Sequence, residues 1–185
     1  MDGTVRRVSR DGLGAELDRR EEPATSVAVS ADGAWIAAGA EDGTVRLTET
    51  ATGHHRELDR HKARVTALAF SADGTWLASG CADHTTRLFR LSDGTFRSFD
   101  EGGYGVEQLA FSPDSKMLIL LSRGEAQLRR LRVEAGEHLA PLPGHRGGLN
   151  GFSMSEDGRR LLAFGTDGAT RLIDLSDGEG RALQG

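Results

Sequence analysis

Apolar residues along this chain occur in short blocks or alternate with polar residues, and polar turns separate the blocks. Asp-Gly pairs recur in the turns. A two-residue alternation bounded by such turns predicts short strands joined by tight hairpins, and no stretch follows the spacing of an amphipathic helix. The pattern therefore predicts an all-β protein.

The strands belong to an internal repeat, which is marked by an apolar residue followed by Ser-x-Asp. The steps between successive marker aspartates are 41, 41 and 43 residues. The marker aspartates are Asp32, Asp73, Asp114 and Asp157. A second marker keeps the same register. It reads DGTVRL at Asp42, DHTTRL at Asp83 and DGATRL at Asp167. A relative of it, DGTVRR, starts one period earlier at Asp2. A repeat of about 40 residues is therefore the organising unit of the chain.

Each repeat has room for four strands. In the second copy they are expected at 65–71, 76–80, 85–91 and 95–99. The first of these is almost wholly small or apolar, as in a strand buried on both faces, whereas the fourth alternates like an outer strand. One four-stranded antiparallel unit cannot bury both of its faces, but neighbours stacked around an axis can.

The repeat resembles a blade of the WD-repeat β-propeller family. Gly144-His145 matches the Gly-His signature of the family, LASG at 77–80 matches its second strand, and RLID at 171–174 matches the end of its third strand. The resemblance implies a β-propeller of four-stranded antiparallel blades. We expect four full blades at 21–60, 61–100, 101–142 and 143–185.

Residues 1–20 are expected to form only the outer two strands of a further blade, because the second marker at Asp2 has no first marker before it. The ring would then be partial or open. The rest of a longer polypeptide or a second chain would complete it.

The resemblance also implies a hydrogen-bonded network inside each blade. Carried over by position, the second copy supplies His61, Ser79 and Asp83, with Phe89 where the family has Trp. The other expected members are Asp42, His145 and Asp167. In the third copy Arg129 is expected at the Trp position and Arg123 at the Asp position.

The charge and cysteine content narrow the classes of partner and compartment. A net charge of −5 and a pI near 5.7 argue against a nucleic-acid or membrane-binding surface, since both need a basic face. Cys81 is the only cysteine, so no disulfide forms within the chain. With no apolar run long enough to span a membrane and no signal peptide at the N-terminus, we expect a cytoplasmic protein.

Sequence motifs of catalysis are absent. The histidines at 61 and 145 stand at the Gly-His position, and the others have no Cys or carboxylate pair at ligand spacing, so no metal site is expected. Neither a G-x-S-x-G elbow nor a phosphate-binding loop occurs. We therefore expect no enzyme activity and no cofactor.

In the resembled family, partners bind at one mouth of the ring, where loops enter the first strands and where the second strand turns into the third. Tyr and Arg are the residues that most often dominate binding energy, which favours Tyr104, Arg64 and Arg146. By position the full set of expected rim residues is Glu41, Lys62, Arg64, Tyr104, Arg123, Arg146 and Asn150.

The resemblance favours a non-catalytic platform that binds a protein partner, as the sensor or docking propeller segment of a larger signalling or effector protein. Proteins with similar blades, rich in Ala, Gly, Asp and Arg, are often parts of bacterial signalling chains, so the resemblance also implies a bacterial source. One alternative is a stand-alone scaffold that completes its ring by self-association through open blade faces. Another is a propeller hydrolase, which would need acid and base groups at the axis. The small, apolar first strands supply none.

Overall fold

The structure is a computed structural model that describes residues 4–8, 14–19, 23–142, 144–175 and 181–183, with side chains described within 23–142 and 144–175. The described residues form strands and turns and contain no α-helix. No described segment therefore forms a helix that could cross a membrane. The prediction of an all-β protein is confirmed.

Four antiparallel sheets of four strands form four blades. Blade 1 contains β3 Ala24–Val29, β4 Trp35–Ala40, β5 Thr44–Glu49 and β6 His55–Arg60. Blade 2 contains β7 Val65–Phe70, β8 Trp76–Cys81, β9 Thr85–Arg90 and β10 Phe96–Asp100. Blade 3 contains β11 Val106–Phe111, β12 Met117–Ser122, β13 Arg129–Arg132 and β14 Glu137–Leu139. Blade 4 contains β15 Leu149–Met154, β16 Arg160–Gly165, β17 Thr170–Asp174 and β18 Arg181–Leu183. A separate two-stranded sheet pairs β1 Thr4–Val8 with β2 Gly14–Arg19.

The Ser-x-Asp-Gly marker is a hydrogen-bonded turn between the first and second strands. In blade 1 the Ser30 hydroxyl donates to Asp32 Oδ1 at 2.5 Å and accepts from the Trp35 amide at 2.9 Å. Gly33 adopts a φ of +70°, which glycine reaches without steric cost. The same Ser–Asp bond recurs at Ser71, Ser112 and Ser155. The marker recurs because each blade needs the same turn.

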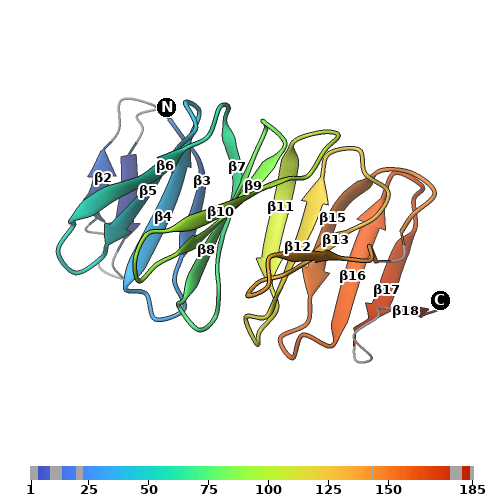
Figure 1. The fold of residues 1–185 in the computed structure, drawn as a ribbon. Coiled ribbons are helices and arrows are strands. Elements are labelled where there is room, and N and C mark those ends of the chain that lie inside the picture. The colour runs from blue at the N-terminus through green and yellow to red at the C-terminus, as the bar shows by residue number, and fades with distance from the viewer. Residues whose placement is uncertain (1–3, 9–13, 20–22, 143, 176–180, 184–185) are drawn as a thin grey trace.

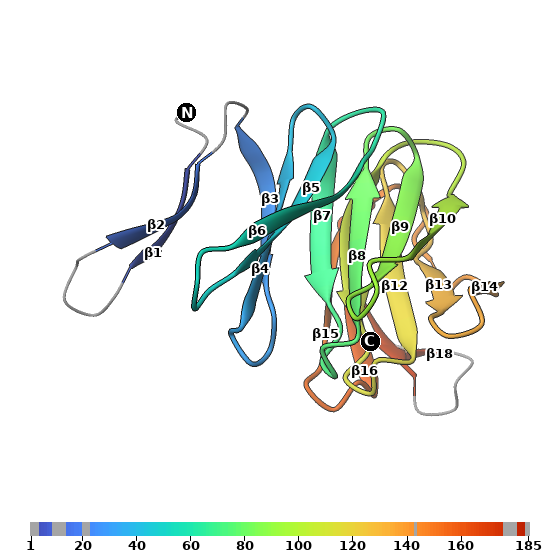
Figure 2. The ribbon, with the colours of Figure 1, turned by 60° about the vertical axis from the view of Figure 1, so that its left-hand side comes forward.

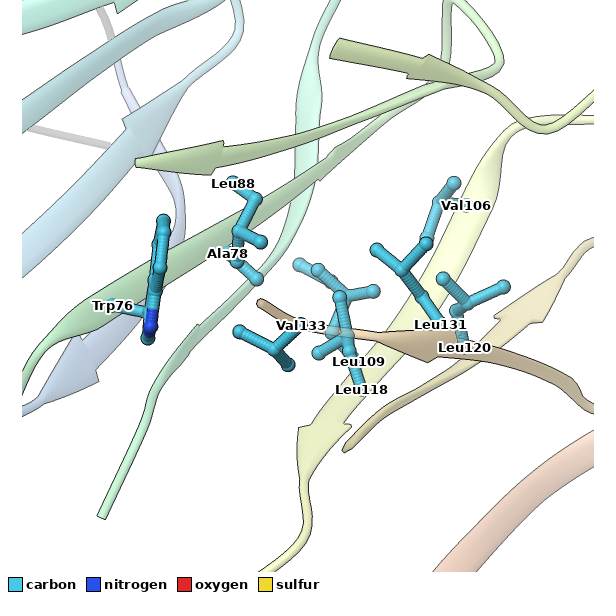
Figure 3. Packing of buried hydrophobic residues seen from close by; sticks show 10 residues of the cluster. Trp76, Ala78, Leu88, Val106, Leu109, Leu118, Leu120, Leu131 and Val133 are labelled. Carbon is cyan, nitrogen blue, oxygen red and sulfur yellow. The ribbon is translucent and has the colours of Figure 1, made fainter. Parts of the chain in front are cut away.

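Neighbouring blades bury their faces against each other (Figures 1 and 3). Between blades 2 and 3, Trp76, Ala78 and Leu88 face Leu109 and Leu118 in one apolar core. Corresponding cores lie between blades 1 and 2 and between blades 3 and 4. Stacking thus buries the apolar sheet faces that a single repeat would leave exposed to solvent.

Strand pairing corrects one expectation in blade 3. Leu118 pairs with Leu131 as Leu77 pairs with Phe89, so Leu131 stands at the Trp position. Placing Arg129 there was wrong. A constant step of 41 residues from Phe89 leads to position 130, and the connection between β12 and β13 is one residue longer, so the position falls on Leu131, two residues beyond Arg129. Arg129 instead corresponds to Arg87 of blade 2.

The blades form an arc that is not closed into a ring, with the described chain ends at opposite ends of the arc (Figure 1). In Figure 2 the β1–β2 hairpin stands apart beside blade 1. Val27 and Val29 on β3 are 59% and 60% exposed. At the other end of the arc, Leu162 and Phe164 on β16 are 44% and 47% exposed. Both ends of the arc therefore present apolar side chains to solvent.

Candidate functional site

A cavity of about 920 Å³ opens at the end of blades 1 to 3 where chains enter the first strands. It is hereafter called the mouth cavity. Its walls come from these entries and from the turns between second and third strands, which antiparallel pairing brings to the same end of each blade. The lining residues are Pro23, Ala24, Thr25, Glu41, Arg64, Thr66, Ala82, His84, Tyr104, Gly105, Val106, Glu107 and Arg123.

Four of the expected rim residues line the mouth cavity, namely Glu41, Arg64, Tyr104 and Arg123. Lys62 lies beside it in a second hollow, which also contains Asp83 and His84. Arg146 and Asn150 are exposed on blade 4 and do not line the mouth cavity. The geometry thus gathers the rim residues of blades 1 to 3 and leaves those of blade 4 apart.

Tyr104 is an exposed large hydrophobic residue of the mouth cavity, at 66%. Gly102 and Gly103, which precede it, have φ angles of +62° and +67°, so the connection turns sharply before β11. The Tyr104 ring lies about 3.5 Å from the position that a side chain at Gly124 would occupy. A side chain at 124 would therefore only touch the ring, and the φ of +75° is what favours glycine there.

The charged groups of the mouth cavity pair only loosely. Arg64 Nε lies 3.9 Å from Glu41 Oε2, and Arg123 Nε lies 3.5 Å from Glu107 Oε1. The side chains of Arg64 and Arg123 are 52% and 77% exposed. Exposed pairs at such distances contribute less than about 1 kcal/mol, so both guanidinium groups can exchange their partner for a ligand carboxylate at small cost.

His84 is a residue of this site that the sequence analysis missed. It has a φ of +71° in the turn where the other blades have Gly43, Gly124 and Gly168. Its Nδ1 is buried without a hydrogen-bond partner. The signal was present in the sequence, since DHTTRL replaces the glycine of DGTVRL by histidine. A non-glycine residue held in this backbone region is strained and often serves a site.

In blade 2 the histidine forms hydrogen bonds with two hydroxyl groups, and Phe89 stands where the family has Trp. His61 Nε2 lies 2.7 Å from Ser79 Oγ, and His61 Nδ1 lies 3.0 Å from Thr85 Oγ1. Asp83 accepts from the Lys62 and Thr85 amides at 2.8 and 3.0 Å. Burial lowers the pKa of His61 to about 4, so the ring is neutral at pH 7. This network holds the turn and the strand entry that border the mouth cavity.

In blade 4 the network is reduced. His145 Nδ1 lies 2.8 Å from Asp167 Oδ1, and this bond holds the pKa of Asp167 well below its ordinary value. His145 Nε2 is buried without a partner. Ala163 occupies the strand position that corresponds to Ser79, because it pairs with Arg171 as Ser79 pairs with Arg87.

In blade 3 a glutamate replaces the histidine. The Glu101 amide donates to the His84 carbonyl, as the His61 amide donates to the Gly43 carbonyl. The Glu101 side chain is fully buried, and neither carboxylate oxygen has a hydrogen-bond partner. Burial raises its pKa, with Arg129 and His138 nearby at 3.9 and 3.8 Å.

Donor atoms of His61, Cys81 and Asp83 lie within 4.8 Å of one another. Protein groups already engage each of them: Ser79 and Thr85 contact the ring, Cys81 Sγ contacts the Ala63 carbonyl, and backbone amides donate to Asp83. Burial also raises the pKa of Cys81 to about 11, which disfavours the thiolate that a metal would need. The cluster therefore reads as part of the blade network.

Stacked four-stranded blades with a mouth at one end define a propeller-type repeat protein. Three segments, 16–49, 53–90 and 136–174, match the WD40 model, described as WD domain, G-beta repeat. Since these matches cover more than half of the chain, it belongs to the WD40 repeat family.

Single proteins similar to this chain match it over different fractions of their lengths. Human WD repeat-containing protein 86 is 46% identical over 48 residues, which are 26% of this chain and 13% of that protein. The crystal structure of the Myceliophteria thermophila Cps50 (Swd1) β-propeller domain matches 89% of this chain and 57% of its own, with TM-score 0.77 and 21% identity. The computationally designed Ika4 protein matches 88% of this chain and 99% of its own, with TM-score 0.74 and 22% identity. The chain thus spans only part of the first two, and the structural matches support the fold alone.

Proposed function

We propose that this chain is a non-catalytic platform that holds a protein partner in the mouth cavity. The finer proposal is that it serves as the sensor or docking propeller segment of a larger signalling or effector protein. WD40 propellers are commonly protein-interaction scaffolds, which supports the first statement. The signalling context, a bacterial source and a cytoplasmic location stay predictions from the sequence.

The observation that carries the proposal is the convergence of Tyr104, Arg64 and Arg123 on one cavity from different blades. An exposed aromatic ring beside loosely paired guanidinium groups is typical of a protein-binding surface. The arrangement fits an extended peptide with an acidic side chain for the arginines and an apolar group against the tyrosine ring.

A peptide-display selection against the purified chain tests this proposal. We expect enriched peptides whose binding weakens at least about tenfold with Tyr104→Ala or Arg64→Ala, as for residues at the centre of an interface. Arg159→Ala is the matched control, because Arg159 is exposed at the opposite end of blade 4, beside the Ser-x-Asp-Gly turn.

The control should leave peptide affinity unchanged. Selected peptides that bind Tyr104→Ala and Arg64→Ala as tightly as the wild type would contradict the assignment of the mouth cavity.

A further inference from the structure

We propose that the two open ends of the arc bind each other between two copies of this chain, head to tail, in a closed ring. The N-terminal end face consists of Ala24, Val27 and Val29 on blade 1. The C-terminal end face consists of Leu162 and Phe164 on blade 4. The proposal does not rest on the partner proposed for the mouth cavity, although Ala24 also lines that cavity.

The N-terminal end face of blade 1 corresponds to the face of blade 2 that packs against blade 1. Val27 corresponds in register to Leu68, since they pair with Ala38 and Ser79 at equivalent positions of the second strand. Leu68 packs into the apolar core that includes Ala37 of blade 1. Val27 has no such blade before it and is 59% exposed.

The C-terminal end face of blade 4 corresponds to the faces of blades 1 to 3 that pack against the following blade. Leu162 corresponds in register to Ala37, Ala78 and Ile119, each of which is fully buried against the following blade. Leu162 is 44% exposed, since no blade among the described residues packs against it. The two end faces are therefore the two halves of one blade-to-blade interface. By this register Leu162 of one copy would meet Val27 of the other.

Side-chain sizes across this missing interface also match. Where blade 1 meets blade 2, a Cβ added at Gly39 would lie only 2.4 Å from Val65. Where blade 2 meets blade 3, a Cβ added at Gly80 would lie 2.5 Å from Val106. At these two junctions the valine of the following blade therefore leaves no space for a side chain at the facing glycine.

The corresponding residues at blades 3 and 4 are Leu121 and Leu149, which share one core. At the open ends they are Phe164 and Ala24. A phenylalanine with an alanine contains as many side-chain carbon atoms as two leucines. The bulky Phe164 would clash with a valine but is matched by the small Ala24, so the ends are complementary in shape.

The β1–β2 hairpin does not already serve as the missing partner. It forms its own two-stranded sheet, and Val27 and Val29 remain exposed in its presence. A lone two-stranded hairpin is marginally stable, whereas a whole blade buries a continuous apolar face. The blade of a second copy would therefore displace the hairpin from the space in front of blade 1.

The blade count favours a closed ring over a filament. Two copies supply eight full blades, and known propellers close with four to eight. Head-to-tail contacts form a ring when their rotation closes and a fibre when it does not. In such a ring each of the two junctions joins one N-terminal end face to one C-terminal end face. The exposed side chains of both faces, Val27, Val29, Leu162 and Phe164, then become buried.

Sedimentation velocity across a dilution series tests the proposal on the whole chain. We expect a species of twice the 19.8 kDa chain mass. Val27→Asp on one face and Leu162→Arg on the other should each weaken dimerisation at least about tenfold. Phe164→Ser is a milder variant of the same face, and Phe96→Asp is the control, since Phe96 is 43% exposed on β10 of blade 2 and belongs to neither end face.

An equimolar mixture of V27D and L162R provides the decisive arm. In a head-to-tail ring one junction is wild type and the other joins opposite charges, so the mixture should regain the dimer. A wild-type chain that stays monomeric at every concentration would overturn the proposal. So would end-face variants that dimerise normally, a mixture that stays monomeric, or open-ended polymers in place of a dimer.

Discussion

A hydroxyl that contacts the histidine in blade 2 and is absent from the corresponding position of blade 4 should have a measurable effect on stability. Ser79→Ala removes the partner of His61 Nε2, which lies in a fully buried ring. Ala163→Ser places a hydroxyl at the corresponding position of blade 4, where His145 Nε2 is buried without a partner. The two substitutions are therefore opposite tests of the same hydrogen bond.

The magnitudes follow from the cost of an unpaired buried group. Ser79→Ala should lower the free energy of unfolding by about 1–3 kcal/mol, because it leaves the His61 nitrogen unsatisfied. Ala163→Ser should raise it by about 1 kcal/mol, since His145 donates from Nδ1 to Asp167 and so presents an acceptor at Nε2. Ala163 is 1% exposed, so solvent cannot supply this bond in the wild type.

Urea unfolding followed by circular dichroism measures both changes. The control is Ala163→Ser in a His145→Ala background, where the new hydroxyl has no histidine to bond and should be neutral or destabilising. The reasoning is refuted if Ala163→Ser changes stability equally in both backgrounds.

Three further outcomes are expected. Asp83→Ala should lower the free energy of unfolding by about 1 kcal/mol more than Asp42→Ala in urea titrations, because Asp83 also accepts from the Lys62 amide at the entry to β7; equal losses would contradict this. Glu101 has a raised pKa, so its contribution to stability is present below pH 4.5 and lost as pH rises through the folded-state pKa. Glu101→Gln should therefore raise the melting temperature at pH 7 and much less near pH 4; an equal rise at both would exclude this cause. His84→Gly should stabilise the fold by about 1 kcal/mol in urea while weakening peptide binding at the mouth cavity, since it relieves a strained φ; unchanged binding would remove His84 from the site.

Much of the fold was predictable because one local pattern recurs. In blade 2 each expected strand lies within a residue of the observed one, and the Ser-x-Asp-Gly turns formed as hydrogen-bonded units. Such a turn is defined mainly by local features, namely the bond from the Thr75 amide to Asp73 and the positive φ of Gly74. Register within a repeat therefore followed directly from the sequence.

Other features depend on contacts that no short pattern encodes. The Trp position of blade 3 falls on Leu131, two residues beyond Arg129, and only strand pairing reveals it. The burial of Glu101 depends on the packing of blade 3, to which the repeat markers give no guide. The pairing of Phe164 with Ala24 becomes visible only when residues at opposite ends of the chain are compared as one interface.

The candidate site was predictable in part. Positional reasoning named Glu41, Arg64, Tyr104 and Arg123, and the geometry gathers them because strand entries and second turns share one end of each blade. It also named Arg146 and Asn150, which lie on blade 4 and outside the cavity. Curvature of the arc decides which blades share a cavity, and curvature is not readable from a repeat.

The most direct test of the central claim is hydrogen–deuterium exchange of the chain with and without a bound selected peptide. The account predicts slowed exchange of backbone amides at the entries 62–66 and 102–107, which border the mouth cavity. Amides of the turns 72–74 and 113–115, at the opposite end of the blades, should exchange unchanged. Protection at those opposite turns, with none at the mouth entries, would contradict the claim that this chain binds its partner through the mouth cavity.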